Sequence, residues 1–100
     1  MLRVIKVTGD SLSPDYREGD YVVVATIPFF LNRIQVGDVI VFQQQVYGIL
    51  IKKVAQVEGA GEQFFVVGVH SDSVDSRHFG PVPRQSLIGR VIWHIPKPTR

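Results

Sequence analysis

"YGILIKKVAQVEGAGEQFFVVG", residues 47–68, contains two runs rich in Val, Ile, Leu and Phe on either side of a short polar segment. β-Branched and aromatic residues favour strands, and both runs are of strand length. The segment between them, EGAGE at 58–62, has glycines flanked by acidic residues, which is the composition of a hairpin turn. This stretch therefore predicts two antiparallel strands, at about 47–57 and 63–68.

The same alternation of apolar runs and turn residues continues through the rest of the chain. Gly19-Asp20 and Gly37-Asp38 each precede a β-branched run, where glycine can take the positive φ that starts a new strand direction. Apolar residues show no sustained 3.6-residue period, so helix is limited to a turn or two, near 83–87. Further strands are predicted at about 2–7, 20–27, 38–42 and 88–95. The predicted fold class is mainly all-β, a small partly closed barrel or folded-over sheet of about six strands.

The composition restricts the classes of function. A chain of 100 residues with 45% hydrophobic content can form one core, so we predict a single domain over 1–100. The net charge of +2 is too small to indicate a nucleic-acid partner. The absence of cysteine excludes disulfides, thiolate metal sites and a cysteine nucleophile. We therefore expect no nucleic-acid partner, no metal and no cofactor. The function should depend on side chains that carry oxygen or nitrogen, or on the shape of the protein.

The apolar stretches are too short to predict a membrane span. The longest, YVVVATIPFFL at 21–31, contains Pro28 and falls below the roughly 20 residues that cross a bilayer. The first residues, MLRVIKV, are too short and too alternating for a signal peptide. For the chain as given we expect a soluble, cytoplasmic protein, and membrane association if a longer form carries an anchor.

Ser11 stands in a polar turn, VTGDSLSPDYREGD at 7–20. A serine hydroxyl is a weak nucleophile at neutral pH, so catalysis requires a neighbouring base and donors for the oxyanion. His70, His78 and His94 are available as bases, but their spacing selects none of them. We interpret His94, beside Trp93 in the last strand, as a structural or surface residue.

A lysine can act as the base if burial lowers its pKa enough to leave it neutral. The strand at 47–57 supplies Lys52 and Lys53. Alternation puts Lys52 on one face with Leu50 and Val54, and Lys53 on the other face, which is also apolar. Periodicity therefore does not decide which lysine meets the core, and both could reach solvent from an edge or twisted strand.

A third polar stretch, GVHSDSVDSRHFGPVP at 68–83, has the composition of a loop. Asp75 and Arg77 could form an ion pair that holds it.

Together these stretches resemble the motifs of the Ser-Lys peptidases of the signal peptidase I superfamily. That superfamily includes mitochondrial inner membrane peptidases, soluble maturation proteases of nickel superoxide dismutase and, more distantly, self-cleaving repressors. Its patterns are G-x-S-M-x-P-T, G-D-V-V-x-F, K-R-V and S-x-D-S-R-x-x-G-x-V-P. The matching blocks, in the same order, are GDSLSPDYREGDYVVV at 9–24, VGDVIVF at 36–42, IKKVAQVEG at 51–59 and SVDSRHFGPVPRQSLIGRV at 73–91.

The resemblance implies a role for each matching residue and a fold like the signal peptidase catalytic core. Ser11 matches the nucleophile, and its backbone N–H would donate to the oxyanion. Lys52 matches the general base. Ser73 matches the serine that orients this base, while Asp75 and Arg77 match a structural ion pair.

The sequence also departs from the family patterns. Leu12 replaces Met, Asp15 replaces Thr, and GVH at 68–70 replaces G-D-N. Gly9 stands where bacterial signal peptidases often carry a second, hydroxyl-bearing oxyanion donor. The extra β-region and the anchor of many bacterial signal peptidases are not found in this sequence, which most resembles the short soluble maturation proteases.

The resemblance implies a serine endopeptidase that removes an N-terminal extension or signal-type peptide from a protein precursor. The precursor would bind as an extended strand along a sheet edge. The alternative is a catalytically inactive peptide- or protein-binding domain on the same scaffold. A third hypothesis is a self-cleaving regulator cut at Ala60-Gly61, but we interpret that pair as part of the hairpin.

Overall fold

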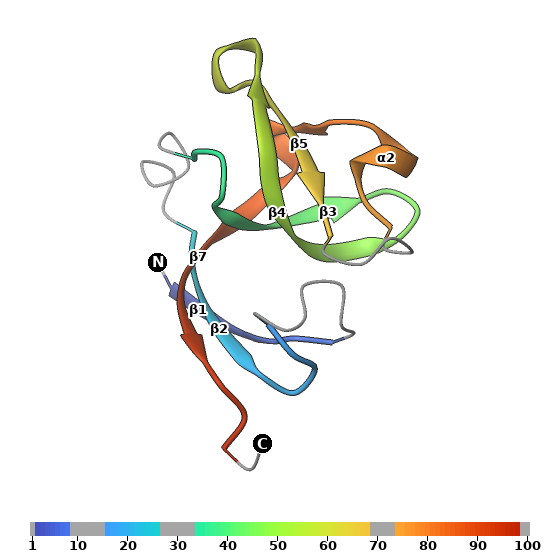
Figure 1. The fold of residues 1–100 in the computed structure, drawn as a ribbon. Coiled ribbons are helices and arrows are strands. Elements are labelled where there is room, and N and C mark those ends of the chain that lie inside the picture. Colours follow the sequence, from blue (N-terminus) through green and yellow to red (C-terminus); the bar gives the residue numbers. More distant parts are fainter. Residues whose placement is uncertain (1, 9–15, 27–33, 69–73, 99–100) are drawn as a thin grey trace.

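The computed structural model describes residues 2–8, 16–26, 34–68 and 74–98. Its elements are β1 (Leu2–Lys6), β2 (Tyr21–Ala25), β3 (Val39–Gln44), β4 (Gly48–Glu58), η1 (Gly59–Gly61), β5 (Gln63–Val67), α2 (Ser76–Phe79), β6 (Val82–Pro83), η2 (Arg84–Ser86) and β7 (Leu87–Ile95). The strands form one antiparallel sheet in the order β1-β2-β7-β3-β4-β5-β6 (Figure 1). Since the outermost strands β1 and β6 do not pair with each other, the sheet is not closed into a barrel.

The all-β prediction is confirmed, with each of the predicted strands present within a few residues of its expected bounds. The seventh strand, β6, was not predicted because two residues are too few to show alternation and one of them is Pro83. The turn of helix expected near 83–87 is the 3-10 helix η2. α2 was missed because its four residues lie in a polar stretch without an apolar period.

The predicted turns are also present. The segment 58–62 connects β4 to β5 and places Glu58 opposite Gln63. Ala60 has a left-handed φ of 56° within it, so Ala60-Gly61 belongs to the hairpin, as interpreted from the sequence. Gly19 and Gly37 have φ values of 94° and 97°, which side-chain-bearing residues rarely adopt.

Buried side chains form two clusters on opposite faces of β3. The first, here called the β3–β6 core, consists of Ile34, Ile40, Phe42, Val54, Phe64, Val66 and Val82. The second, here called the β1–β2 core, consists of Val7, Val22, Val24 and Val41. Because successive side chains of a strand point to opposite faces, Ile40 and Phe42 enter one cluster and Val41 the other. β3 is therefore buried on both sides, which explains its continuous apolar run.

β7 joins the two parts of the sheet. Its second half pairs with β2, and its first half pairs with β3 (Figure 1). Gly89 lies at this transition, where a Cβ atom would stand 2.5 Å from the carbonyl oxygen of Ala25. The absence of a side chain thus lets β7 pass close to the end of β2.

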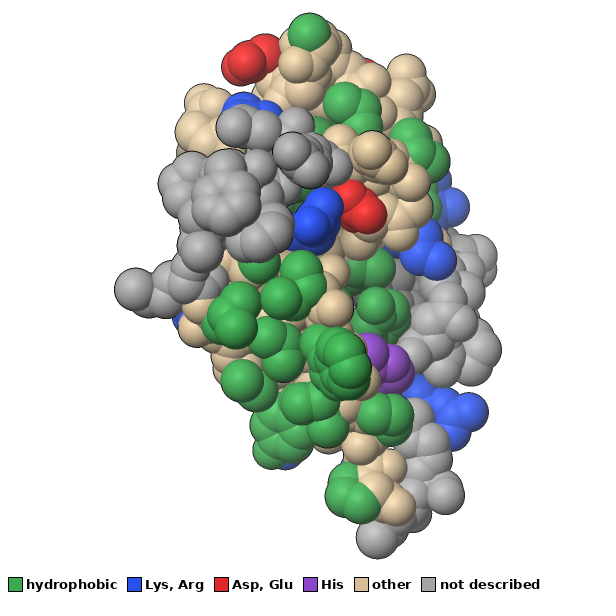
Figure 2. Space-filling model, turned by 90° about the vertical axis from the view of Figure 1, so that its left-hand side faces the viewer, with side chains coloured by type: hydrophobic (Ala, Val, Ile, Leu, Met, Phe, Trp, Pro, Cys, Tyr) green, Lys and Arg blue, Asp and Glu red, His purple; other side chains and the backbone are tan. Residues whose placement is uncertain are grey.

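The outer face of β1, β2 and β7 is apolar and exposed. The strand register aligns Val4 with Val23 and Trp93, and Lys6 with Tyr21 and Ile95. Trp93 is 67% exposed and Val4 63% exposed. In the space-filling view of Figure 2, apolar side chains cover much of the lower half of the molecule. Within the described residues, no helix has the length and apolar character needed to span a bilayer.

Candidate active site

Lys52 is the buried member of the lysine pair. It lies opposite Ile40 of β3 and shares the face of β4 that carries Val54, so its side chain enters the β3–β6 core. Lys52 is only 5% exposed, whereas Lys53, on the other face, is partly exposed. Periodicity did not decide which of the two lysines is buried. The structure decides it, because the face of β4 that carries Lys52 is covered by the β3–β6 core.

The surroundings of Lys52 favour a neutral amine. Burial lowers its pKa from the ordinary value of 10.5, and this effect outweighs the attraction of the Asp75 carboxylate, which raises it. The positive charge of Arg77 lowers the pKa further. Among the residues that the structure describes, none forms a hydrogen bond or an ion pair with the side-chain amine of Lys52. A desolvated amine of this kind can accept a proton near neutral pH more readily than an exposed lysine.

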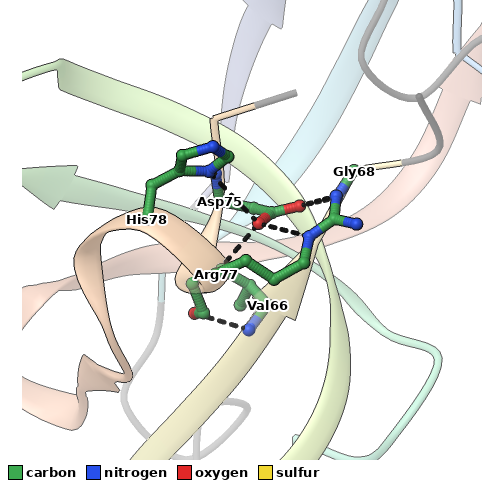
Figure 3. Close-up of polar contacts among 6 residues, drawn as sticks. Val66, Gly68, Asp75, Arg77 and His78 are labelled. Carbon is green, nitrogen blue, oxygen red and sulfur yellow. Dashed lines mark hydrogen bonds and ion pairs between the residues drawn. The ribbon is translucent and has the colours of Figure 1, made fainter. Parts of the chain in front are cut away.

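Asp75 organises a polar cluster (Figure 3). Its charge acts on Lys52. Its fully buried carboxylate accepts hydrogen bonds from the Arg77 guanidinium, with Nε 2.9 Å from Oδ1 and Nη2 2.6 Å from Oδ2. The backbone N–H groups of Gly68 and Arg77 donate at 2.9 and 3.0 Å. The ion pair expected from the sequence is therefore present, and it also caps the N-terminus of α2.

The pKa of Asp75 reflects opposing effects. Burial raises it, but the hydrogen bonds from Arg77 and from the backbone of Gly68 and Arg77 outweigh burial and lower the pKa from 3.8 to about 2. Asp75 is thus ionised at neutral pH. Lys52 therefore faces a carboxylate whose charge is already balanced by an arginine.

Ser76 fixes this cluster to the sheet and was not singled out from the sequence. Its side chain is buried, and its Oγ accepts a 2.8 Å hydrogen bond from the N–H of Val66 on β5 (Figure 3). The Gly68 N–H bond to Asp75 makes a second link between the end of β5 and the start of α2. Both ends of the segment that contains Ser73 are consequently held in place.

Ser11, Ser73, Gly9 and His70 lie outside the described residues. The chain on either side of the Ser11 segment is well anchored. The N–H of Val7 donates to the Asp20 carbonyl at 2.7 Å, and the N–H of Gly19 donates to the Val7 carbonyl at 2.9 Å. Among the predicted site residues, the structure brings together Lys52, Asp75 and Arg77.

The two described histidines have structural contacts. His94 Nε2 lies 2.6 Å from Oδ2 of the fully buried Asp20, and the His94 ring packs against Tyr16 at a centroid distance of 4.6 Å. His78 accepts a hydrogen bond of 3.4 Å from the Asp75 N–H at the start of α2. The contact between His94 and Asp20 agrees with the interpretation of His94 as a structural residue. Among the described side chains, no group of three His, Cys, Asp or Glu residues is arranged to hold a metal ion.

Comparison with known proteins covers nearly the whole chain. The family model described as "Signal peptidase, peptidase S26" matches residues 1–62 and 58–95. A comparison with curated proteins found no match.

Proposed function

The chain belongs to the signal peptidase family, peptidase S26, and from this premise we propose that it is a serine endopeptidase in which Ser11 and Lys52 form the catalytic dyad. The observation that carries the proposal is the burial of Lys52, which is 5% exposed and has a lowered pKa. A domain that only bound peptides would gain nothing from a desolvated amine, because such a group destabilises the fold.

In the proposed reaction, the neutral Lys52 amine takes the proton of the Ser11 hydroxyl as Ser11 Oγ attacks the scissile carbonyl carbon. The backbone N–H of Ser11 donates to the resulting oxyanion. The C–N bond then breaks, the Lys52 ammonium returns its proton to the leaving amine, and an acyl-enzyme remains. Lys52 next takes a proton from the water that attacks the ester carbonyl. It returns this proton to Ser11 Oγ as the ester bond breaks, which releases the second product and restores the Ser11 hydroxyl and the neutral amine.

The polar cluster supports this role for Lys52. A lone carboxylate beside the amine would stabilise the ammonium form and remove the base. Burial is the largest influence on the pKa of Lys52, and the positive charge of Arg77 partly offsets the opposing effect of Asp75. In the proposal Ser73 hydrogen-bonds the Lys52 amine and orients it toward Ser11.

The proposed substrate is a protein precursor whose N-terminal extension or signal-type peptide is removed. It binds as an extended strand along a sheet edge, where unpaired backbone groups provide affinity.

The experiment is cleavage of precursor peptides by the purified protein, followed by mass spectrometry. Ser11→Ala and Lys52→Ala should each reduce cleavage by about 10³-fold or more, with circular dichroism unchanged. Lys53→Ala is the matched control and should retain most activity. Activity that survives Lys52→Ala would rule out the dyad. Peptide binding without cleavage by the wild-type protein would instead support the inactive binding domain.

A further inference from the structure

A cavity of about 300 Å³ lies between the β3–β4 hairpin and the segment from α2 to η2. Phe42, Phe79, Val82 and two prolines form its apolar walls. Gln43, Gln44, Gln45 and Ser86 supply uncharged polar groups, and polar atoms make up more than half of the lining. The described residues that line it include no charged side chain. Such a lining favours a bulky uncharged side chain and disfavours a carboxylate or an ammonium group, which would lose solvation without gaining a partner.

The cavity lies on the face of the sheet that carries Lys52. Lys52 is opposite Ile40, and the next residues on this face, Leu50 and Phe42, are opposite each other. Phe42, a wall of the cavity, is thus two residues along β3 from the partner of Lys52, which corresponds to about 7 Å. α2 also connects the two places, because Asp75 caps its start beside Lys52 and Phe79 at its end lines the cavity.

The walls of the cavity are held by contacts of their own. The Phe79 ring lies 6.0 Å from the Phe42 ring and 6.3 Å from the Tyr47 ring, measured between centroids. Gln44 Oε1 accepts hydrogen bonds from the N–H groups of Val46 and Tyr47 at 2.7 and 2.8 Å, which fixes the hairpin turn. A site formed before the ligand arrives loses less entropy when it binds.

We propose that this cavity is a specificity pocket for one large uncharged side chain of the precursor, such as Leu, Met, Phe or Tyr. This inference rests on the proposed function, since it assigns the pocket to the peptide cut at Ser11. Burying such a side chain contributes about tenfold to a hundredfold to kcat/KM.

The test is a set of peptides that differ at one position at a time, with Leu, Phe, Ala, Asp or Lys at each position around the bond. The wild-type protein should prefer Leu or Phe over Asp and Lys at one position, by about tenfold to a hundredfold. Gln45→Lys places a positive charge at the exposed rim and should change this preference in favour of Asp at the same position only. Gln56→Lys, at an exposed position of β4 that does not line the cavity, is the matched control.

The outcomes separate this inference from the proposed function. The pocket assignment is wrong if peptides are cleaved but no position shows the preference. It is also wrong if Gln45→Lys and Gln56→Lys change the preference alike. In both cases the proposed endopeptidase function is unaffected. If no peptide is cleaved, the proposed function fails, and the same peptides are compared by fluorescence anisotropy for binding. Binding that discriminates Leu from Asp and responds to Gln45→Lys would then support the pocket, and uniform binding or none would overturn it.

Discussion

Arg77 donates to both carboxylate oxygens of Asp75, with Nε 2.9 Å from Oδ1 and Nη2 2.6 Å from Oδ2. The two members of the pair differ in solvent exposure. The Arg77 side chain is 47% exposed, whereas Asp75 is fully buried. Asp75 is therefore the member that cannot be solvated when the pair is broken. Lys52 feels both charges, with Asp75 raising its pKa and Arg77 lowering it.

Removing the Arg77 charge should change the pH dependence of catalysis. In Arg77→Ala the Asp75 charge is no longer balanced, so the pKa of Lys52 rises and the rising limb of kcat/KM moves to higher pH. Activity at neutral pH should fall while activity at alkaline pH recovers. Arg77→Lys keeps the positive charge and should shift the profile less. An unshifted profile in Arg77→Ala would show that Arg77 has no influence on the base.

Asp75 should make the protein acid-sensitive. Its pKa is lowered in the folded state from 3.8 to about 2, so its contribution is complete above about pH 5 and is lost progressively as the pH falls to 2 and below. The shift corresponds to about 2 kcal/mol of stability at neutral pH. Urea denaturation between pH 2 and 6 measures it. Asp75→Asn should be less stable at pH 6 and should lack most of this pH dependence.

The burial of Lys52 should reduce the stability of the fold at every pH at which its amine is protonated in the unfolded chain. Because its pKa is lower in the folded than in the unfolded state, the unfolded chain binds more protons at pH values between the two, and stability rises with pH over that range. Lys52→Met removes the buried amine and should increase the free energy of unfolding at pH 7 by about 1–3 kcal/mol. The partly exposed Lys53 supplies the control, since Lys53→Met should change stability by much less. A Lys52→Met protein less stable than wild type at pH 7 would contradict this account.

His94 should contribute to stability through Asp20. The Asp20 carboxylate also accepts hydrogen bonds from the N–H groups of Arg17 and Lys97, at 3.0 and 2.9 Å, and these remain in His94→Ala. Losing the His94 contact at a fully buried carboxylate should cost about 1–3 kcal/mol in thermal or urea denaturation. His78→Ala is the comparison, because His78 is half exposed and its hydrogen bond is longer. Equal losses in the two variants would show that the Asp20 contact is of no special importance.

The sequence pattern predicted the strands well, because the alternation of β-branched residues and the glycines of turns determine the backbone conformation within a few residues. It could not choose between Lys52 and Lys53, since both have apolar neighbours and only the tertiary packing of the β3–β6 core determines which face of β4 is the interior. It also missed the contact between Asp20 and His94, which are 74 positions apart. Ser76 was passed over because a serine in a polar stretch gives no local sign that its hydroxyl will meet the N–H of a distant strand.

The passage of β7 from β2 to β3 has a consequence for biosynthesis. Among the described strands, backbone pairing between the β1–β2 hairpin and the β3–β6 meander runs only through β7. Ser11 follows the first strand of one part and Lys52 belongs to the other. While a ribosome is still making residues 87–95, the two parts lack the strand that joins them. The proposed dyad would therefore be complete only after residues 87–95 have been synthesised and have paired with both β2 and β3.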